Sequence, residues 1–242
     1  MKKQMSIYYS KAEIEEIGEA IISRYLGSRS PQRCIDIEGF IREYLHAEIQ
    51  YEYFSEDDVD KIGFLADGRT PLQVIRNRQP KTIVFPIDTV VIDRLLLQGR
   101  NSARRRFTLA HEAAHIILNR SYNNVPSHGY NRVFDPEQNY TADELRAILN
   151  MGESQADNLA AVLLMPQSNV RSIFDEFVKG HTITLYGRNS LKPTDKMLIR
   201  EMADEMGVSY TALKIRLRNL NYFEFRSIDE FITEQFGIGG GL

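Results

Sequence analysis

Residues 107–115 read FTLAHEAAH and contain the pattern H-E-x-x-H. They lie in a run without proline or glycine, residues 102–119, and such a run predicts an α-helix. On a helix His111 and His115 share one face, with Cβ atoms about 5–6 Å apart, so both imidazoles can reach one zinc ion. Glu112 then lies beside the metal and can accept a proton from a bound water. The pattern therefore predicts the metal-binding helix of a hydrolase.

The other explanation for this helix is a structural core without a metal. Its flanking residues are largely apolar, which favours burial of the helix. Two neutral imidazoles buried there without a metal would each need another hydrogen-bonding partner. A metal bound by both side chains removes that need, so we favour the metal site.

A third ligand is expected further along the chain, because catalytic zinc has three protein ligands and keeps one position for water. Glu153 and Asp157 lie four residues apart in a second helical run, residues 153–165, so their carboxylates share one face. We assign Glu153 as the metal ligand and Asp157 as the acceptor of a histidine N–H, and the reverse assignment stays open. The rest of the run is apolar, which argues against a merely solvated acidic face.

A metal-dependent hydrolase that attacks a carbonyl group also uses a hydrogen-bond donor for the oxyanion of its tetrahedral intermediate. Residues 121–140 have no clear period and contain two prolines and a glycine, so we predict a long loop there. The candidate donors in that loop are His128 and Tyr130, with Tyr122 and Tyr140 behind them. A role as ordinary surface residues is the favoured reading for each of them, because loops commonly carry such side chains.

Strands are expected before the metal-binding helix, and the chain from about residue 102 onward is expected to be mostly helical. Residues 49–53 alternate between apolar and polar, and residues 81–85 form a further short apolar run. Residues 62–65 and 72–75 flank the turn signal Asp67-Gly68, which predicts a hairpin. Helical patterns precede and follow these strands, so the chain is expected to be an α+β protein.

Composition excludes several classes of protein. The 242 residues carry 30 Lys and Arg against 33 Asp and Glu, a net charge of -3, which argues against direct DNA binding as the main role. The apolar runs are far shorter than the ~20 residues that span a bilayer, and no secretory signal is readable, so we expect a cytoplasmic protein without membrane association. Cys34 is the only cysteine, which excludes disulfides within the chain and a cysteine-based zinc finger.

Two stretches together resemble the ImmA/IrrE family of metallo-endopeptidases. They are RFTLAHEAAH at residues 106–115 and ESQADNLAAVLLMP at residues 153–166. Residues 35–38 (IDIE) are similar to the family's usual N-terminal opening, and residues 207–220 resemble its C-terminal helices. The resemblance covers most of residues 35–220.

The resemblance implies a zincin-like fold with a small antiparallel sheet packed on the H-E-x-x-H helix. It implies zinc at His111, His115 and Glu153, with Glu112 as general base, and Mn²⁺ or Fe²⁺ can occupy a similar ligand set. We expect a peptidase domain over residues 1–190, with a loop insertion at about 120–140. A helical, helix-turn-helix-like region with a flexible Gly-rich end is expected over residues 191–242.

The resemblance also implies a substrate class, the Xre-type helix-turn-helix repressors, whose cleavage would derepress mobile-element or stress genes. The alternative is a regulator that does not cleave and binds a repressor or DNA through its C-terminal helices. Lys214, Arg216 and Arg218 would supply basic side chains for that role. The intact H-E-x-x-H favours the peptidase, because site residues are a stronger warrant than fold analogy.

Overall fold

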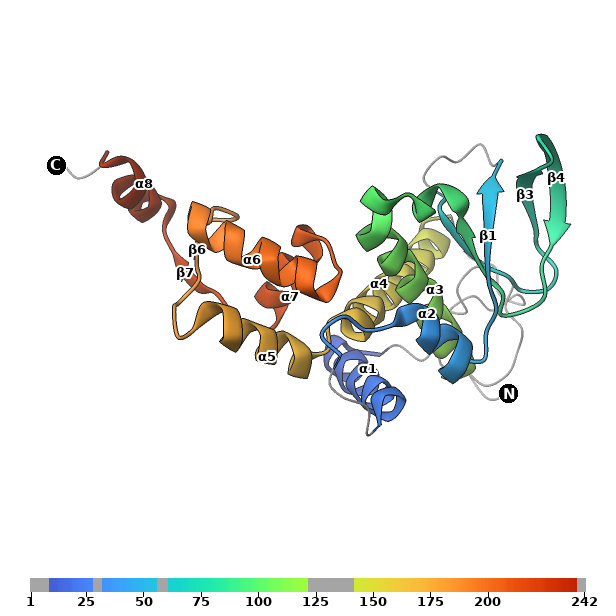
Figure 1. The fold of residues 1–242 in the computed structure, drawn as a ribbon, viewed down its shortest axis with the longest axis horizontal. Coiled ribbons are helices and arrows are strands. Elements are labelled where there is room, and N and C mark those ends of the chain that lie inside the picture. The colour runs from blue at the N-terminus through green and yellow to red at the C-terminus, as the bar shows by residue number, and fades with distance from the viewer. Residues whose placement is uncertain (1–8, 28–31, 56–60, 122–141, 239–242) are drawn as a thin grey trace. The chain divides into compact units, whose positions relative to one another are not determined.

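The structure, a computed structural model, describes residues 9–27, 32–55, 61–121 and 142–238, with residues 142–150 described by their backbone alone (Figure 1). The chain divides into two compact units: residues 1–30 with 35–164, and residues 31–34 with 165–242. The domain division expected at residues 190 and 191 stays a prediction. The loop expected at about 120–140 lies almost wholly outside the described residues. None of the helices in the described parts of the chain has the length and apolar character of a transmembrane span.

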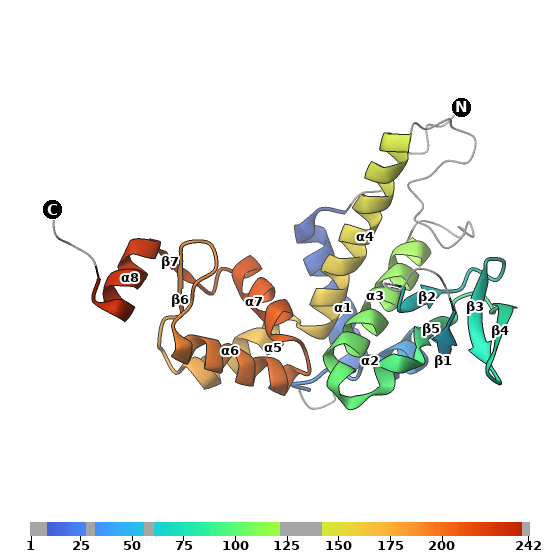
Figure 2. The ribbon, with the colours of Figure 1, turned by 90° about the horizontal axis from the view of Figure 1, so that it is seen from above.

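Unit 1 places the H-E-x-x-H helix at the centre of a layered fold. Its helices are α1 (Lys11–Leu26), α2 (Ile37–Gly39), α3 (Ser102–Ser121) and α4 (Ala142–Leu164), with a π-helical turn at Phe40–Tyr44 and 3-10 turns at Arg94–Leu97 and Gly99–Asn101. Its strands are β1 (Ile49–Phe54), β2 (Gly63–Leu65), β3 (Pro71–Arg76), β4 (Gln79–Val84) and β5 (Val90–Asp93). Helix α3 packs against β2 and β5, α4 packs against α3, and α1 packs against α4 (Figure 2). Because α3 has neighbours on both sides, most of its apolar residues are buried.

The five strands form one sheet in the order β2-β5-β1-β3-β4. The prediction of an antiparallel sheet was wrong at one pair, because β1 and β5 run parallel with Ile49 opposite Val90. No strand was predicted at β5, whose four residues are all buried. A strand buried on both faces has a continuous apolar run such as Val90-Val91-Ile92, without the alternation that marks a half-buried strand. The α+β class is confirmed, with a mixed sheet.

The hairpin of unit 1 lies elsewhere than predicted. The strands expected to pair across Asp67-Gly68 do not, since β2 pairs with β5 and β3 pairs with β1 and β4. Asp67 instead accepts hydrogen bonds from the backbone of Arg69 and Thr70, which closes a local loop. The hairpin joins β3 and β4 through Asn77 and Arg78, which both have positive φ. Positive φ at both residues is what a two-residue turn needs in order to match the twist of the two strands.

The helical run predicted at residues 153–165 is the second half of a longer continuous helix, α4, which passes through Gly152. Residues 141–144 (TADE) match a capping box that predicts a helix start at Thr141, and this residue lies outside the described residues. A buried glycine lowers helix propensity by only about 1 kcal/mol, which packing overrides here. One rigid helix therefore carries both candidate carboxylates, Glu153 and Asp157.

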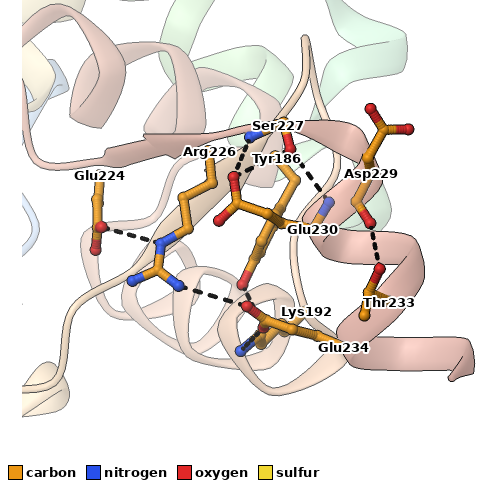
Figure 3. Close-up of polar contacts among 9 residues, drawn as sticks. All are labelled: Tyr186, Lys192, Glu224, Arg226, Ser227, Asp229, Glu230, Thr233 and Glu234. Carbon is orange, nitrogen blue, oxygen red and sulfur yellow. Dashed lines mark hydrogen bonds and ion pairs between the residues drawn. The ribbon is translucent and has the colours of Figure 1, made fainter. Parts of the chain in front are cut away.

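Unit 2 contains the helix pair expected near the C-terminus. Its elements are α5 (Gln167–Val178), β6 (Thr184–Tyr186), α6 (Pro193–Met206), α7 (Tyr210–Asn219), β7 (Glu224–Arg226) and α8 (Ile228–Phe236). Gly207 ends α6 in the left-handed region and Ser209 caps α7, which makes the sharp turn between them. Strands β6 and β7 pair in parallel. Glu234 of α8 accepts a hydrogen bond from the Tyr186 hydroxyl (2.8 Å) and pairs with Lys192 and Arg226, which ties α8 to this sheet (Figure 3).

Candidate metal centre

Helix α3 presents two imidazoles one turn apart, as the H-E-x-x-H spacing predicts. The ring centroids of His111 and His115 are 4.6 Å apart, and their Nε2 atoms are separated by 3.0 Å. Both side chains are only partly exposed. The two nitrogens therefore point at the same small region beside the helix.

Helix α4 brings a carboxylate to that region. Oε2 of Glu153 lies 3.1 Å from Nε2 of His111, and its Oε1 lies 3.6 Å from Nε2 of His115. One ligand atom from each of the three side chains lies within 4.8 Å of the others. Among the described residues, no other group of three His, Cys, Asp or Glu side chains is arranged in this way.

Asp157 lies one helical turn after Glu153 and contacts the other side of the first imidazole. Its Oδ1 is 2.9 Å from Nδ1 of His111. Nδ1 therefore donates to the carboxylate, and Nε2 faces the site, where it offers a lone pair to a metal ion once its proton is displaced. This geometry favours Glu153 as the ligand and Asp157 as the residue that orients His111.

The electrostatics of the site follow from these contacts. Burial opposes a charge on His111, but hydrogen bonds with Asp157 and Glu153 overcome it and raise the pKa of His111 to about 10. Hydrogen bonds from His111 and His115 hold the pKa of Glu153 well below its ordinary value. In the absence of a metal the site thus binds a proton on His111, and a metal ion must displace it.

Glu112 lies on a different face of α3, against the sheet. Its side chain is 7% exposed. Burial raises the pKa of Glu112, and the positive fields of His115 and His111 oppose that rise only in part. A carboxylate of this kind accepts a proton readily and remains close to the imidazoles, which is what a general base beside a metal needs.

The donor set suits a divalent metal of the zinc type. Two imidazole nitrogens and one carboxylate oxygen are the three protein ligands of many catalytic zinc sites, with a fourth position for water. The second imidazole nitrogen of His111 is held by a carboxylate, the usual support for such a ligand. His111, His115 and Glu153 would hold the ion.

The predicted oxyanion donors His128 and Tyr130 lie outside the described residues, as do Tyr122 and Tyr140. Their roles stay predictions.

Gly63 and Lys61 also act on Glu112, and neither was predicted from the sequence as a site residue. A Cβ atom placed on Gly63 would lie 2.4 Å from Oε1 of Glu112, so β2 touches the carboxylate. The positive charge of Lys61 slightly opposes the raised pKa of Glu112. The available signal was an isolated glycine inside an apolar strand pattern, which often marks a close approach.

Comparison with known proteins agrees with this geometry. The family Peptidase_M78, described as the IrrE N-terminal-like domain, matches residues 88–218, which include both α3 and α4. No curated protein matches the chain. The family is one of metallopeptidases, so a divalent metal is implied. Because the match covers more than half of the chain and includes every residue of the candidate metal centre, the protein belongs to the IrrE N-terminal-like peptidase family.

Proposed function

We propose that this protein is a zinc-dependent endopeptidase. The observation that carries the proposal is the convergence of His111, His115 and Glu153 from two packed helices, with the buried carboxylate of Glu112 on the same helical turn. When bound, zinc would lower the pKa of a water molecule and polarise the carbonyl of the substrate. A site with these parts fits hydrolysis better than a purely structural metal site, which has no need of a buried base.

Glu112 would take the proton of the attacking water on its carboxylate and deliver it to the leaving amine. Its burial supports both steps, because the raised pKa stabilises the protonated form between the two transfers. Asp157 would keep the Nδ1–H of His111 engaged and so fix the ring.

The edge of the sheet supports a peptide as the substrate. Ile62 and Ala66 direct their backbone groups at β5, through hydrogen bonds with Asp93 and Thr89. Because backbone groups alternate in direction along a strand, the N–H and C=O groups of Gly63 and Leu65 point to the outer edge, where no described strand pairs with β2. An extended peptide could add to this edge through main-chain hydrogen bonds and would then pass Glu112.

The substrate we propose is an Xre-type helix-turn-helix repressor, on the strength of the family resemblance. Its cleavage would release repression of mobile-element or stress genes. The regulator that binds DNA without cleavage has less support, because Arg216, one of its three basic residues, is 4% exposed and donates to the carbonyl of Met165.

The test is cleavage of such a repressor by the zinc-loaded protein, followed by mass spectrometry of the products. The Glu112→Gln variant should retain zinc and lose at least ~100-fold in rate, because the amide cannot accept the proton. Glu16→Gln, an exposed glutamate on α1, is the matched control and should cleave normally. An active Glu112→Gln protein would refute the assigned base. Cleavage of an unfolded protein but not of the repressor would overturn the substrate and retain the peptidase.

A further inference from the structure

Gly63 lies in the edge strand β2, opposite Ile92 of β5. Its φ is not in the positive region, unlike that of six other glycines of the described chain, so its backbone conformation is open to any residue. Glycine weakens a strand, since it gains no side-chain packing and loses more entropy on folding. The reason for a glycine here must therefore be the space around its Cα atom.

That space is filled by the metal-binding helix. A Cβ atom on Gly63 would lie 2.4 Å from Oε1 of Glu112, 2.6 Å from Cγ2 of Thr108 and 3.3 Å from Cδ of Glu112. Non-bonded contacts of a Cβ atom shorter than 3.0 Å essentially never occur in real proteins. A methyl group on Gly63 and the present position of the Glu112 carboxylate exclude each other.

The two helix side chains differ in how easily they can move. Thr108 is 7% exposed, and its hydroxyl donates to the carbonyl of Arg104 at 3.0 Å, which fixes its rotamer. The carboxylate of Glu112 is the far end of a longer side chain with three rotatable bonds. An added methyl group would therefore displace the carboxylate, and its remaining close contact with Thr108 would also require a small shift of β2 or of the threonine.

We propose that Gly63 is a positioning residue for the general base: the missing side chain of the edge strand sets where the Glu112 carboxylate lies relative to the metal-binding histidines. The inference rests on the proposed function, in which Glu112 moves the proton. A misplacement of a reacting group by about 1 Å can lower a rate ~100-fold. Gly63 would act through Glu112 without touching the substrate's reacting atoms itself.

The first experiment compares Gly63→Ala with Gly99→Ala in the zinc-loaded protein. A Cβ on Gly99 meets no described atom within 4 Å, and this glycine also has an ordinary φ, so it is a matched control. Gly63→Ala should bind one zinc per chain and keep its KM, with kcat lowered ~100-fold. Gly99→Ala should match the wild type in all three measurements. Unchanged kcat in Gly63→Ala overturns the proposal, and so does loss of zinc, because the glycine would then serve the metal site.

A crystal structure of Gly63→Ala gives a readout that does not depend on activity. We expect the Glu112 carboxylate to move by about 1 Å or more, while His111, His115 and Glu153 superpose on the wild type. A shift of β2 with an unmoved carboxylate overturns the inference. If the wild type cleaves nothing, the proposed function fails, and this structure still decides the role of Gly63.

Thermal unfolding covers the case in which Gly63→Ala does not fold. In the Glu112→Ala background the conflicting carboxylate is absent, so Gly63→Ala should lower the Tm less than it does in the wild type. An equal loss of Tm in both backgrounds, or failure to fold in both, would show that the glycine serves strand packing and would overturn the proposal.

Discussion

Glu153 and Asp157 occupy successive turns of one helix face but touch different atoms. Glu153 approaches Nε2 of both histidines, whereas Asp157 reaches only Nδ1 of His111. The first arrangement suits a metal ligand and the second suits a residue that orients a ligand. The two carboxylates should therefore differ in how much metal affinity they support.

We expect Glu153→Ala to weaken zinc binding more than Asp157→Ala. Loss of an orienting carboxylate typically lowers metal affinity by about 10–100-fold, and loss of a ligand lowers it further. Competition with a chelator of known affinity measures both variants against the wild type. The opposite ranking would exchange the two roles.

The pH dependence of metal binding follows from His111. Its pKa of about 10 in the metal-free protein exceeds the ordinary value of 6.5, so its protonation stabilises the metal-free fold below pH 6.5, and this contribution is lost as the pH rises through 10. Zinc must displace that proton, so the apparent affinity should rise by up to ~10-fold per pH unit between pH 7 and 9. Isothermal titration in buffers of different ionisation enthalpy counts the protons released. Asp157→Asn should reduce the number released at pH 8, and affinity that does not change with pH would contradict the prediction.

Among the site residues, those that lie within one helical turn of each other could be predicted to come together from the sequence. His111, Glu112 and His115 share one helical turn, and Glu153 with Asp157 shares another, so helix geometry places each group. Gly63 could not be assigned a role, because its environment depends on which helix the strand crosses, and that is a tertiary contact.

At the scale of elements, α1 braces the helix that carries Glu153. Gly18 of α1 lies against α4, where a Cβ atom on it would be 2.5 Å from Cγ1 of Val162 and 3.2 Å from Cδ1 of Leu159. Helix propensity alone would favour alanine by about 1 kcal/mol. The close packing of α1 on α4 opposes that gain.

Gly18→Ala should therefore destabilise the protein, by roughly 1–3 kcal/mol from overpacking less the gain in propensity. Urea unfolding followed by circular dichroism measures the change. The double variant Gly18→Ala with Val162→Ala should lose less free energy of unfolding than the two single variants together, because alanine at position 162 makes room for the new methyl group. A Gly18→Ala protein more stable than the wild type would show that the two helices separate easily.

The elements themselves differ in how far the sequence predicts them. Helix α3 was expected because its composition and periodicity agree over many residues. The predicted partner of β2 was wrong, because strand pairing depends on contacts between distant residues. A turn signal such as Asp67-Gly68 can also close a local loop without joining two paired strands. The parallel pairing of β1 with β5 was missed for the same reason, because a short apolar run does not indicate which strand will lie beside it.

At the scale of the whole molecule, every candidate metal residue belongs to unit 1, whereas unit 2 has its own buried residues on α5, α6 and α7. Family membership and the α+β class were predicted correctly, because they rest on motifs and on the order of patterns along the chain. The substrate rests on resemblance alone and awaits the cleavage test.

Removal of the metal should act on one unit only. Zinc at a thousandfold excess over its Kd stabilises the unit that binds it by about 4 kcal/mol, which corresponds to a Tm shift of ~10 °C. Differential scanning calorimetry with and without EDTA should show one transition move and the transition of unit 2 stay in place. A single transition that moves as a whole would mean that the two units unfold together.

The two edges of the five-stranded sheet differ in what they offer to another chain. Strand β4 closes the far edge, and Pro80 lies opposite Ile75 in the register next to the turn, so its missing N–H falls on the outward side. Lys81 adds a charge to the same strand. Proline and lysine discourage the edge-to-edge pairing that leads to fibrils, so β4 protects its edge of the sheet, whereas β2 beside α3 has an outer edge that no described strand covers.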